Sequence, residues 1–414
     1  MSEKLAMTHF LRDILRQPAE LRRTLEMLSG SGEAEAYATK AQLQKAVRAI
    51  REARHVYLTG IGSSWHAGLN IAALFQLGGR PVYLVDAAEL VQFAGIPAGA
   101  VLIVISRSGR SVEIVQLLAK ARESGATVIG ITNAADGALA REAQIGIVVP
   151  VKLDHAISVN TYTTLALAGG WLAGSVVGWT ARNGCPTGSL ADSPATVWNT
   201  VDASAALTGS TAKSGCATEG LADSAAEDLA GRLSRAFAEA GRAIPGWQAQ
   251  IEKSEWLASG SITYFLARGS SLGSAYEARL MWEEGVKSPA TAMGAASFRH
   301  GPQEIVREDM RFGIWIDAAR MREQDLALAR DLRKLGAQVM LIGQRLPVDA
   351  GDLVFQLPVI ASEWQFLIDI IPAQLVAERL ARLSGADPDT FRLCSFVVED
   401  EAGLLPKEKD VSES

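Results

Sequence analysis

The chain has 414 residues, of which 48% are hydrophobic and 21% charged, which is enough for two domains with sizeable cores and excludes extensive disorder. Its net charge of -6 argues against nucleic-acid binding, because proteins of that class usually carry an excess of basic residues. Its three cysteines are too few for a disulfide framework and too widely spaced for a zinc pair. We expect no metal, no cofactor and no nucleic-acid partner.

The first 50 residues have helical periodicity, which Pro18 is expected to break. The N-terminus carries acidic residues and lacks a long apolar run, so it is not typical of a signal peptide. The uncharged stretch between His155 and Ala181 has the length of a short membrane span but no basic flank and no aromatic belt. We interpret this stretch as a buried helix and expect a cytoplasmic protein without membrane contact.

Short apolar runs rich in β-branched residues follow one another from residue 56 to residue 150, separated by helical patterns. Such runs are typical of parallel strands that are covered on both faces. The stretch 112–125 between two of them has a helical period and ends at Gly125, a suitable C-cap. The alternation predicts a doubly wound, flavodoxin-like α/β sandwich. The predicted strands are 56–62, 81–85, 101–106, 127–132 and 145–150.

The same pattern returns in the second half of the chain. VYLTGIGSS at 56–64 and YFLARGSS at 264–271 both end in Gly-Ser-Ser, which makes Gly62 and Gly269 equivalent positions, 207 residues apart. SGATVIGITN at 124–133 and LGAQVMLIGQ at 335–344 match at nearly the same offset. Two matches at one spacing indicate a tandem duplication of one α/β unit. The strands predicted for the second unit are 262–267, 312–317, 338–343 and 352–358.

The segment between the two units is rich in Ala, Ser, Thr and Gly. We interpret it as an elaborated linker with an amphipathic helix at 221–240. The expected organisation is an N-terminal helical segment at 1–45, the first unit at 46–180, the linker at 181–245, the second unit at 246–405 and a polar tail at 406–414.

Two predicted strand ends in the first unit are rich in glycine and hydroxyl groups, GIGSS at 60–64 and SRSGRS at 106–111. Ligands of open parallel sheets bind at the carboxyl ends of strands, where glycine lets the backbone approach an anion and serine donates to it. These loops therefore predict a site for a phosphate monoester. Plain helix capping is the alternative, because serine and glycine are common at helix starts. Neither loop matches a Walker or a dinucleotide-binding fingerprint.

Several stretches of the chain resemble the sugar isomerase (SIS) domain family. GIGSSWHAG at 60–68 and ISRSGRS at 105–111 carry the resemblance in the first unit, and FRHGP at 298–302 carries it in the second. FLRDILRQPAELRRTL at 10–25 and ITNAADGALAREAQIGIVV at 131–149 are similar to the isomerase half of glucosamine-6-phosphate synthase. The resemblance covers roughly residues 8–180 and 246–405, and it implies a homodimer that acts on a small-molecule sugar phosphate.

The resemblance also implies roles for individual residues. Glu284 matches the family's catalytic carboxylate, which moves a proton between C1 and C2, and Glu277 matches a second acidic position. His300 matches a histidine that opens the sugar ring and, in the family, reaches the site of a neighbouring subunit. The implied contacts to the sugar phosphate are Gly62, Ser63, Ser64, Ser106, Arg107, Ser108 and Ser111, with Ser158 as a further sugar contact.

The residues themselves allow these roles and leave alternatives open. A carboxylate with a raised pKa can remove a proton next to a carbonyl, and histidine titrates near neutrality. Glu277 and Glu284 are seven positions apart and are predicted to share one helix face. Glu284 could instead lie on a solvated helix surface, and His300 could be a structural histidine. We interpret His66 and His9 as structural.

Departures from the synthase narrow the expected function. No glutamine-hydrolysing domain is recognised, and the synthase's two site lysines are replaced by Met281 and, at or next to the second position, by Cys394, a further candidate site residue. Ala318-Ala319-Arg320 follows the strand 312–317 where the first unit has its serine loop, so we expect the ligand in the first unit, with the second unit supplying catalytic groups.

We therefore expect an enzyme that isomerises, deaminates or deglycates an amino-sugar phosphate or a ketosamine phosphate, without a lysine Schiff base. A module that binds a phosphosugar and senses it without converting it is the alternative. A structural duplication without any ligand would leave the serine-rich loops unexplained.

Overall fold

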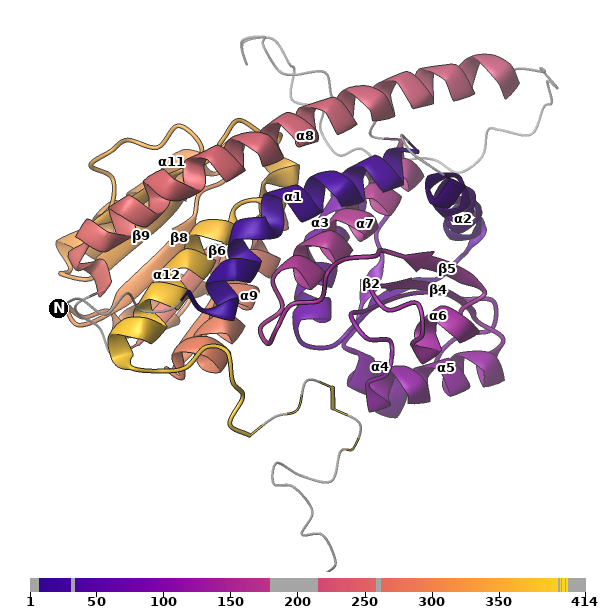
Figure 1. Cartoon of the computed structure of the whole chain (residues 1–414), viewed down its shortest axis with the longest axis horizontal. Coiled ribbons are helices and arrows are strands. Elements are labelled where there is room, and N and C mark those ends of the chain that lie inside the picture. The colour runs from indigo at the N-terminus through magenta and orange to yellow at the C-terminus, as the bar shows by residue number, and fades with distance from the viewer. Residues whose placement is uncertain are drawn as a thin grey trace, which may run out of the picture.

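The computed structural model describes residues 7–30, 34–178, 215–257 and 262–393, together with 395, 397, 398 and 400. Two parallel β-sheets, one in each half of the chain, lie next to each other with helices on their faces (Figure 1). Each sheet has five strands, and its second strand in chain order lies at one edge beside the first. The prediction of two tandem, doubly wound, flavodoxin-like α/β sandwiches is confirmed.

The first sheet has the strand order β2-β1-β3-β4-β5, and every pair in it is parallel. The central strand β3 is buried throughout, as its unbroken apolar run predicted. The strands are β1 (Val56–Thr59), β2 (Tyr83–Leu84), β3 (Val101–Ser106), β4 (Thr127–Thr132) and β5 (Ile145–Val148). The helices between them are α3 (Ser63–Leu77), α4 (Ala87–Gln92), α5 (Val112–Ser124) and α6 (Ala138–Glu142).

The second sheet has the order β10-β9-β8-β6-β7 and is also wholly parallel. Its strands are β6 (Thr263–Ala267), β7 (Ala290–Gly294), β8 (Arg311–Trp315), β9 (Gln338–Gly343) and β10 (Leu353–Gln356). The short and long helices between them are η2 (Gly269–Ser271), α9 (Leu272–Met281), η3 (Trp282–Val286), α10 (Ala295–Phe298), η4 (Pro302–Ile305) and α11 (Arg322–Lys334).

The edge strand β7 is the one strand of the described sheets that the sequence did not predict. Its residues, Ala-Thr-Ala-Met-Gly, are mostly small and have low β-propensity, so no apolar β-branched run marks it. Pairing with β6 along five residues forms it in the tertiary structure.

The remaining helices pack around and between the two sheets (Figure 1). They are α1 (His9–Ser29), α2 (Ala34–Glu52), α7 (Asn160–Val177), α8 (Gly215–Lys253), η1 (Glu255–Leu257), η5 (Ser362–Leu367) and α12 (Ile370–Ser384). The helix predicted at 221–240 is part of α8, which continues through Pro245 and packs along α1. The rest of the expected linker, 181–214, lies outside the described residues.

Helix α1 does not break at Pro18, contrary to the sequence prediction, and runs unbroken for 21 residues. Pro18 is buried on the side that faces α8, where a Cβ added at Gly241 would meet its ring at 3.4 Å. Packing against α8 and a hydrogen bond from Gln17 Nε2 to Gln374 Oε1 (2.6 Å) hold the helix on both sides of the proline. This tertiary support outweighs the loss of one helical hydrogen bond.

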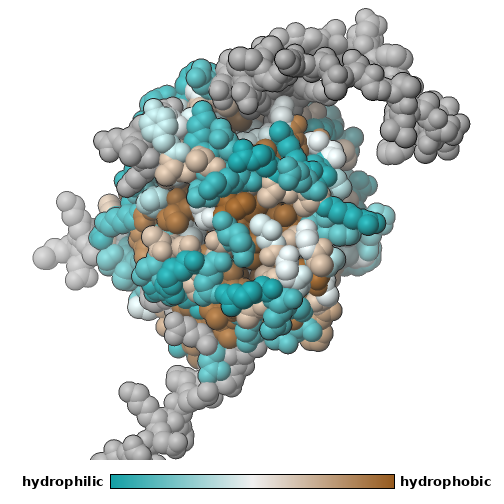
Figure 2. Space-filling view, turned by 90° about the vertical axis from the view of Figure 1, so that its right-hand side faces the viewer, coloured by the Kyte–Doolittle hydropathy of each residue, from teal (hydrophilic) through white to brown (hydrophobic). Residues whose placement is uncertain are grey.

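The uncharged stretch forms α7, which is buried along almost its whole length, as predicted. Of the helices in the described part of the chain, none combines the length and the hydropathy needed to cross a membrane. Figure 2 shows the end of the molecule that carries the first half, where hydrophilic residues are interspersed with smaller hydrophobic areas.

Helices α3 and α9 cross between the two halves and bring them into direct contact (Figure 1). Helix α3 begins at Ser63, within the first Gly-Ser-Ser sequence, and α9 begins directly after the second, so they are equivalent helices of the duplicated unit. A Cβ added at Gly273 of α9 would lie 2.1 Å from Asn70 Oδ1 and 2.3 Å from the His66 carbonyl oxygen of α3. Only glycine allows this approach, which places side chains of the second half beside the first serine loop.

Candidate functional site

The first serine loop lies against a buried carboxylate from the second half. Ser63 Oγ donates to Glu277 Oε1 at 2.9 Å, and His66 Nδ1 lies 2.7 Å from Glu277 Oε2. The His66 and Glu277 side chains are only 4% and 1% exposed. Ser63 and His66 belong to α3 and Glu277 to α9, so the α3–α9 packing brings them together. Both oxygens of this carboxylate are engaged within the protein.

Gly62 gives the first loop its shape. Its φ of 56° and ψ of -131° lie in a region that only glycine adopts readily. A Cβ at this position would have no atom within 4 Å, so the glycine is required by backbone conformation and faces open space. The predicted sugar-phosphate contacts Ser63 and Ser64 follow directly, and Ser64 is buried.

The second serine loop is held partly by its own hydroxyl groups. The amide of Gly109 donates to Ser106 Oγ at 3.0 Å, and the amide of Arg110 donates to Ser108 Oγ at 3.2 Å. The side-chain oxygens of Ser106 and Ser108 thus accept from backbone amides and stabilise the turn, as the alternative to phosphate binding expects. Their hydroxyl protons take no part in these bonds. Ser111 differs, because it stands at the start of α5 without a side-chain cap bond, and its buried Oγ has no partner among the described residues.

The two arginines of this loop have different surroundings. Arg110 pairs with Asp136 at the surface, where its side chain is 47% exposed. Arg107 is half-buried, and burial lowers its pKa while the charges of Asp154 and Glu284 raise it. Arg107 is therefore the arginine within electrostatic reach of the predicted catalytic carboxylate, and Arg110 is not.

A third loop, before α7, brings Ser158 to the same region. Asp154 is buried and accepts hydrogen bonds from the backbone amides of residues 159–161, at 2.8–3.1 Å, which fixes the loop and the start of α7. Ser158 is half-buried in this loop. Its neighbour Ile157 lies so close to η3 that a Cβ added at Gly285 would meet Ile157 Cδ1 at 2.8 Å. The Ser158 loop therefore packs against the turn that carries Glu284.

Glu284 lies on the π-helical turn η3, directly after α9 ends at Met281. Burial and then the charge of Glu277 raise the pKa of Glu284 to about 7, while Arg107 and Lys287 act in the opposite direction. The interaction with Glu277 agrees with the predicted common face, although the helix changes type between the two residues. A single π-helical turn is frequent at functional sites. This carboxyl group can change protonation state near neutral pH.

His300 is not joined to this cluster by any hydrogen bond or ion pair among the described residues. His300 is exposed after α10, and its side chain makes no hydrogen bond to another described residue. Gly301 follows with φ of 130°, a value that requires glycine. Met281, at the place of a synthase lysine, is fully buried. Cys394 lies outside the described residues.

The last described residues of the chain border the same region. The amide of Val112, at the start of α5, donates to the carbonyl oxygen of Val398 at 3.1 Å. Lys287 Nζ donates to the carbonyl oxygens of Thr390 (2.9 Å) and Glu284. The C-terminal segment thus connects η3 with the end of the second serine loop.

The sequence did not predict the partner of His66, which we interpret as a structural histidine and which is buried against Glu277. His66 and Glu277 are separated by 211 positions, and neither has a neighbouring residue that marks them as partners. The contact depends on the close crossing of α3 and α9. Gly273 allows this crossing, but in the sequence it cannot be distinguished from an ordinary helix glycine. Asp154 was missed for the same reason: its role depends on where the loop folds back.

The cluster combines groups suited to binding an anion and moving a proton. Hydroxyl groups from two strand ends and the half-buried Arg107 are typical contacts of a phosphate group. Glu284 adds a carboxyl group with a pKa of about 7, which can both accept and return a proton at neutral pH.

Residues 49–169 match the family model described as SIS domain. Over 407 residues the chain is 24% identical to an isomerizing glutamine–fructose-6-phosphate aminotransferase from Pyrobaculum aerophilum. The aligned region covers 95% of this chain and 58% of that protein. The chain thus spans less than two thirds of the length of the curated relatives it matches.

Solved structures share the two-unit fold. The C-terminal domain of glucosamine-fructose-6-phosphate aminotransferase from Francisella tularensis gives a TM-score of 0.73 at 18% identity, covering 94% of this chain and 99% of that chain. Glucosamine-6-phosphate deaminase from Thermotoga maritima gives a TM-score of 0.69 at 19% identity, covering 95% of this chain and 100% of that chain. The resemblance inferred from the serine loops is confirmed.

Proposed function

We propose that this chain, whose residues 49–169 match the SIS domain model, is an enzyme that converts a phosphorylated amino sugar or ketosamine by moving a proton between C1 and C2. The observation that carries the proposal is the half-buried Glu284, whose pKa is raised to about 7 beside two hydroxyl-rich strand ends. The similarity to an aminotransferase named for fructose 6-phosphate and the shared fold with a deaminase named for glucosamine 6-phosphate support this substrate class.

The phosphate would be held by hydroxyl groups of the serine loops, with Ser108 and Ser111 as donors. Glu284 in its ionised form takes the proton from the carbon next to the carbonyl or imine carbon. The resulting enediolate or enolamine anion receives that proton on the former carbonyl or imine carbon. The hydroxyl or amino proton at the carbon that was deprotonated moves to the former carbonyl oxygen or imine nitrogen, so the sugar is isomerised without a change in composition. Arg107 stabilises the negative charge that Glu284 carries before the transfer.

Glu277 has a different part in this mechanism. Its two oxygens are occupied by Ser63 and His66, so it is not available as a second base in the described geometry. Its charge raises the pKa of Glu284 and thereby sets the pH at which Glu284 becomes ionised. Glu277 is thus a positioning residue that also fixes the orientation of the Ser63 hydroxyl.

In this proposal the nitrogen that forms the imine belongs to the substrate and not to a lysine of the enzyme. Lys287 is the described lysine next to Glu284, and its ammonium group is engaged by two backbone carbonyl oxygens. A substrate that already carries nitrogen at C1 or C2 can form its own imine or enolamine. Where the product is an imine, water adds to its carbon and the amine leaves.

We also propose a homodimer in which His300 completes the site of the second subunit. The support is the resemblance of Phe298-Arg299-His300-Gly301-Pro302 to the family motif and the exposed position of His300. Mixing the inactive variants Glu284→Gln and His300→Ala tests this. Complementation in mixed dimers should restore about a quarter of the wild-type activity, because half of the dimers are mixed and each has one intact site. No restoration, or a monomer in solution, would contradict the dimer.

Proton transfer itself is tested in D₂O with glucosamine 6-phosphate and fructosamine 6-phosphate, followed by NMR. Deuterium should enter the substrate at C1 or C2. Borohydride added during turnover should leave the protein mass unchanged, because no lysine forms an imine. A sugar bound covalently to a lysine would overturn the mechanism. Tight binding of the sugar phosphate without any deuterium exchange would favour a module that senses the sugar without converting it.

A further inference from the structure

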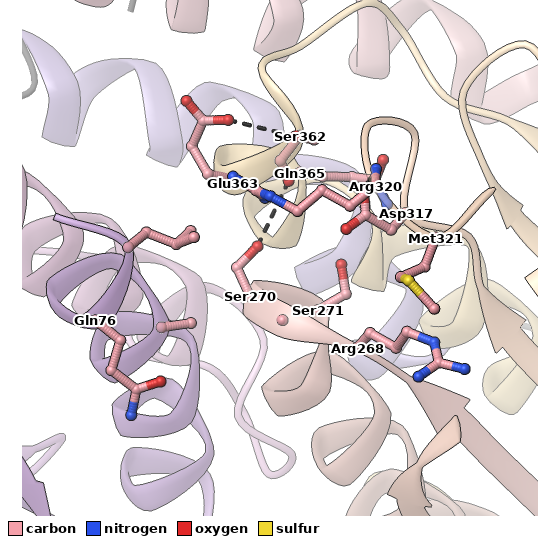
Figure 3. A pocket seen from close by; sticks show the side chains of 13 residues that line it. Gln76, Arg268, Ser270, Ser271, Asp317, Arg320, Met321, Ser362, Glu363 and Gln365 are labelled. Carbon is pink, nitrogen blue, oxygen red and sulfur yellow. Dashed lines mark hydrogen bonds between the residues drawn. The ribbon is translucent and has the colours of Figure 1, made fainter. Parts of the chain in front are cut away.

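A cavity of about 350 Å³ lies in the second half of the molecule, outside the site described above. Polar residues from three segments of the second half surround it, and the last turn of α3 closes it from the side of the first half (Figure 3). Its size falls at the lower end of the range of small-molecule sites. The residues that determine its chemistry are Gln76, Arg268, Ser270, Asp317, Arg320 and Glu363.

The cavity occupies the position that the duplication makes equivalent to the first site. Gly269, after β6, has φ of 55° and no atom within 4 Å of an added Cβ, which repeats the geometry of Gly62 after β1. Residues 317–321, after β8, stand where the second serine loop stands after β3. Residues 362–365, before α12, stand where the Ser158 loop stands before α7.

Two arginines supply positive charge to the cavity. Arg320 is exposed, and its guanidinium group makes no hydrogen bond or ion pair to another described residue. Arg268 is held by a bond from its Nε to Asp325 Oδ1 at 2.7 Å, which orients the guanidinium group and leaves its two terminal nitrogens outside that bond. Planar guanidinium groups with unused N–H groups are suited to the oxygens of a phosphate.

Acceptors and hydroxyl groups complete the lining. Asp317 and Glu363 lie at the rim with the arginines, and carboxylates accept hydrogen bonds from sugar hydroxyls (Figure 3). Ser270 Oγ has only a long contact of 3.5 Å to the Ser362 carbonyl oxygen. Ser271, in contrast, donates to the buried Asp369 at 2.7 Å and is committed to the protein interior. The lining thus pairs cationic donors with acceptors within one small space.

We propose that this cavity is a second binding site, for a small phosphorylated polyol such as a sugar phosphate. Arg268 and Arg320 bind the phosphate group, Ser270 and Gln76 donate to it or to the hydroxyls, and Asp317 and Glu363 accept from the hydroxyls. The sequence predicted a ligand in the first unit only, because the loop after β8 lacks serines. In this site arginine replaces serine as the phosphate donor.

The second site is separate from the first, although one helix borders both. The first turn of α3 carries Ser63, and its last turn carries Gln76, so the two sites lie about 20 Å apart at 1.5 Å per residue. A single ligand of hexose size cannot span both. The second site does not depend on the proposed proton transfer, because no residue of that mechanism lines the cavity.

Equilibrium dialysis with radiolabelled glucose 6-phosphate tests the proposal on the full chain. The wild-type protein should saturate at two ligands per chain. Arg320→Ala removes a side chain without described partners, so the protein should remain folded. The variant should bind one of the two ligands about 10- to 150-fold more weakly. Arg330→Ala, which removes an exposed arginine of α11 outside the cavity, is the matched control and should bind like the wild type.

The double variant Ser108→Ala/Ser111→Ala distinguishes this inference from the proposed function. It should lose the other ligand and keep the one that is sensitive to Arg320. Wild-type saturation at one ligand that only the serine variant loses would overturn the second site and leave the first intact. Saturation at one ligand that only Arg320→Ala loses would support the second site and overturn the first. Absence of binding would overturn both.

Discussion

The two halves of the molecule have the same framework and different chemistry at equivalent strand ends. Each half has five parallel strands in the same order, and Gly62 and Gly269 have φ values of 56° and 55°. After the third strand they diverge. The first half has a serine loop whose hydroxyls hold its own amides, and the second half has Asp317, whose Oδ1 accepts from the amides of Ala319 and Arg320.

This difference shows which part of a duplicated unit is under structural constraint. The glycine after the first strand is kept because the backbone there adopts a positive φ that other residues reach only with strain. The loop after the third strand has no such requirement, since a serine turn and an Asp turn both satisfy its amides. The two halves could therefore acquire different ligand groups without changing the sheets.

The proposed catalytic centre depends on both halves, because the first supplies the serine loops and the second supplies Glu284. Substituting Glu284 by Gln removes the base and should lower turnover by about 10²–10⁴-fold, while sugar-phosphate binding at the first site is retained. Glu283→Gln is the matched control, since Glu283 is more exposed and pairs with Arg279 at 3.3 Å. Steady-state kinetics on both variants measures the effect, and equal losses would exclude a specific role for Glu284.

The same substitution should stabilise the protein at high pH. Burial raises the pKa of Glu284 from 4.5 to about 7, so the folded state binds the proton more tightly than the unfolded state. Stability due to this group is therefore present at pH 4 and is lost as the pH rises from about 4.5 to about 7. Glu284→Gln removes that loss and should be more stable than the wild type by about 1–3 kcal/mol at pH 8.

Denaturant unfolding at pH 5 and pH 8 measures this difference. The gain from Glu284→Gln should shrink strongly at pH 5, where Glu284 is mostly protonated in the folded protein. Glu283→Gln should show a smaller pH dependence, since Glu283 is more exposed. A gain for Glu284→Gln that is equal at both pH values would show that the carboxyl group titrates normally.

The contact between the halves is tested by adding one methyl group to α9. Gly273→Ala places its Cβ against the His66 carbonyl oxygen and Asn70, so the helices must separate and the protein should lose about 1–3 kcal/mol of stability. Gly246→Ala on α8 is the matched control, because no atom lies within 4 Å of its Cβ. The control should gain about 0.5–1 kcal/mol from helix propensity. Equal effects in thermal unfolding would contradict the close crossing.

The smallest expected effect separates ligand binding from helix capping. Ser111→Ala should leave stability unchanged, because Ser111 makes no cap bond, and should weaken sugar-phosphate binding at the first site by about tenfold. Asp86→Ala removes a true cap, the bond from the Ala88 amide to Asp86 Oδ1 at 2.9 Å, and should cost about 1 kcal/mol without an effect on binding. A destabilised Ser111→Ala with unchanged affinity would favour the capping interpretation.

Much of the fold was predictable because its signals are local. Runs such as 101–106 and 127–132 became β3 and β4 with the predicted bounds, since a parallel strand covered on both faces must be apolar throughout. Gly125 ends α5 in the left-handed conformation, as its position after a helical period indicated. Where the local signal was weak, as in β7, or outweighed by packing, as at Pro18, the sequence prediction was missing or wrong.

By itself, the sequence determined the duplication, nine of the ten described strands and the loops that carry the candidate site, because periodicity and turn residues act over a few neighbouring positions. Only the tertiary structure decided which groups meet. The contact of His66 with Glu277 arises where α3 and α9 cross. The pKa of Glu284 is raised by burial and by the charge of Glu277, and the cavity beside Arg320 forms between the last turn of α3 and three segments of the second half. Burial and charge interactions depend on distances between segments some 200 positions apart, and no local pattern encodes those distances.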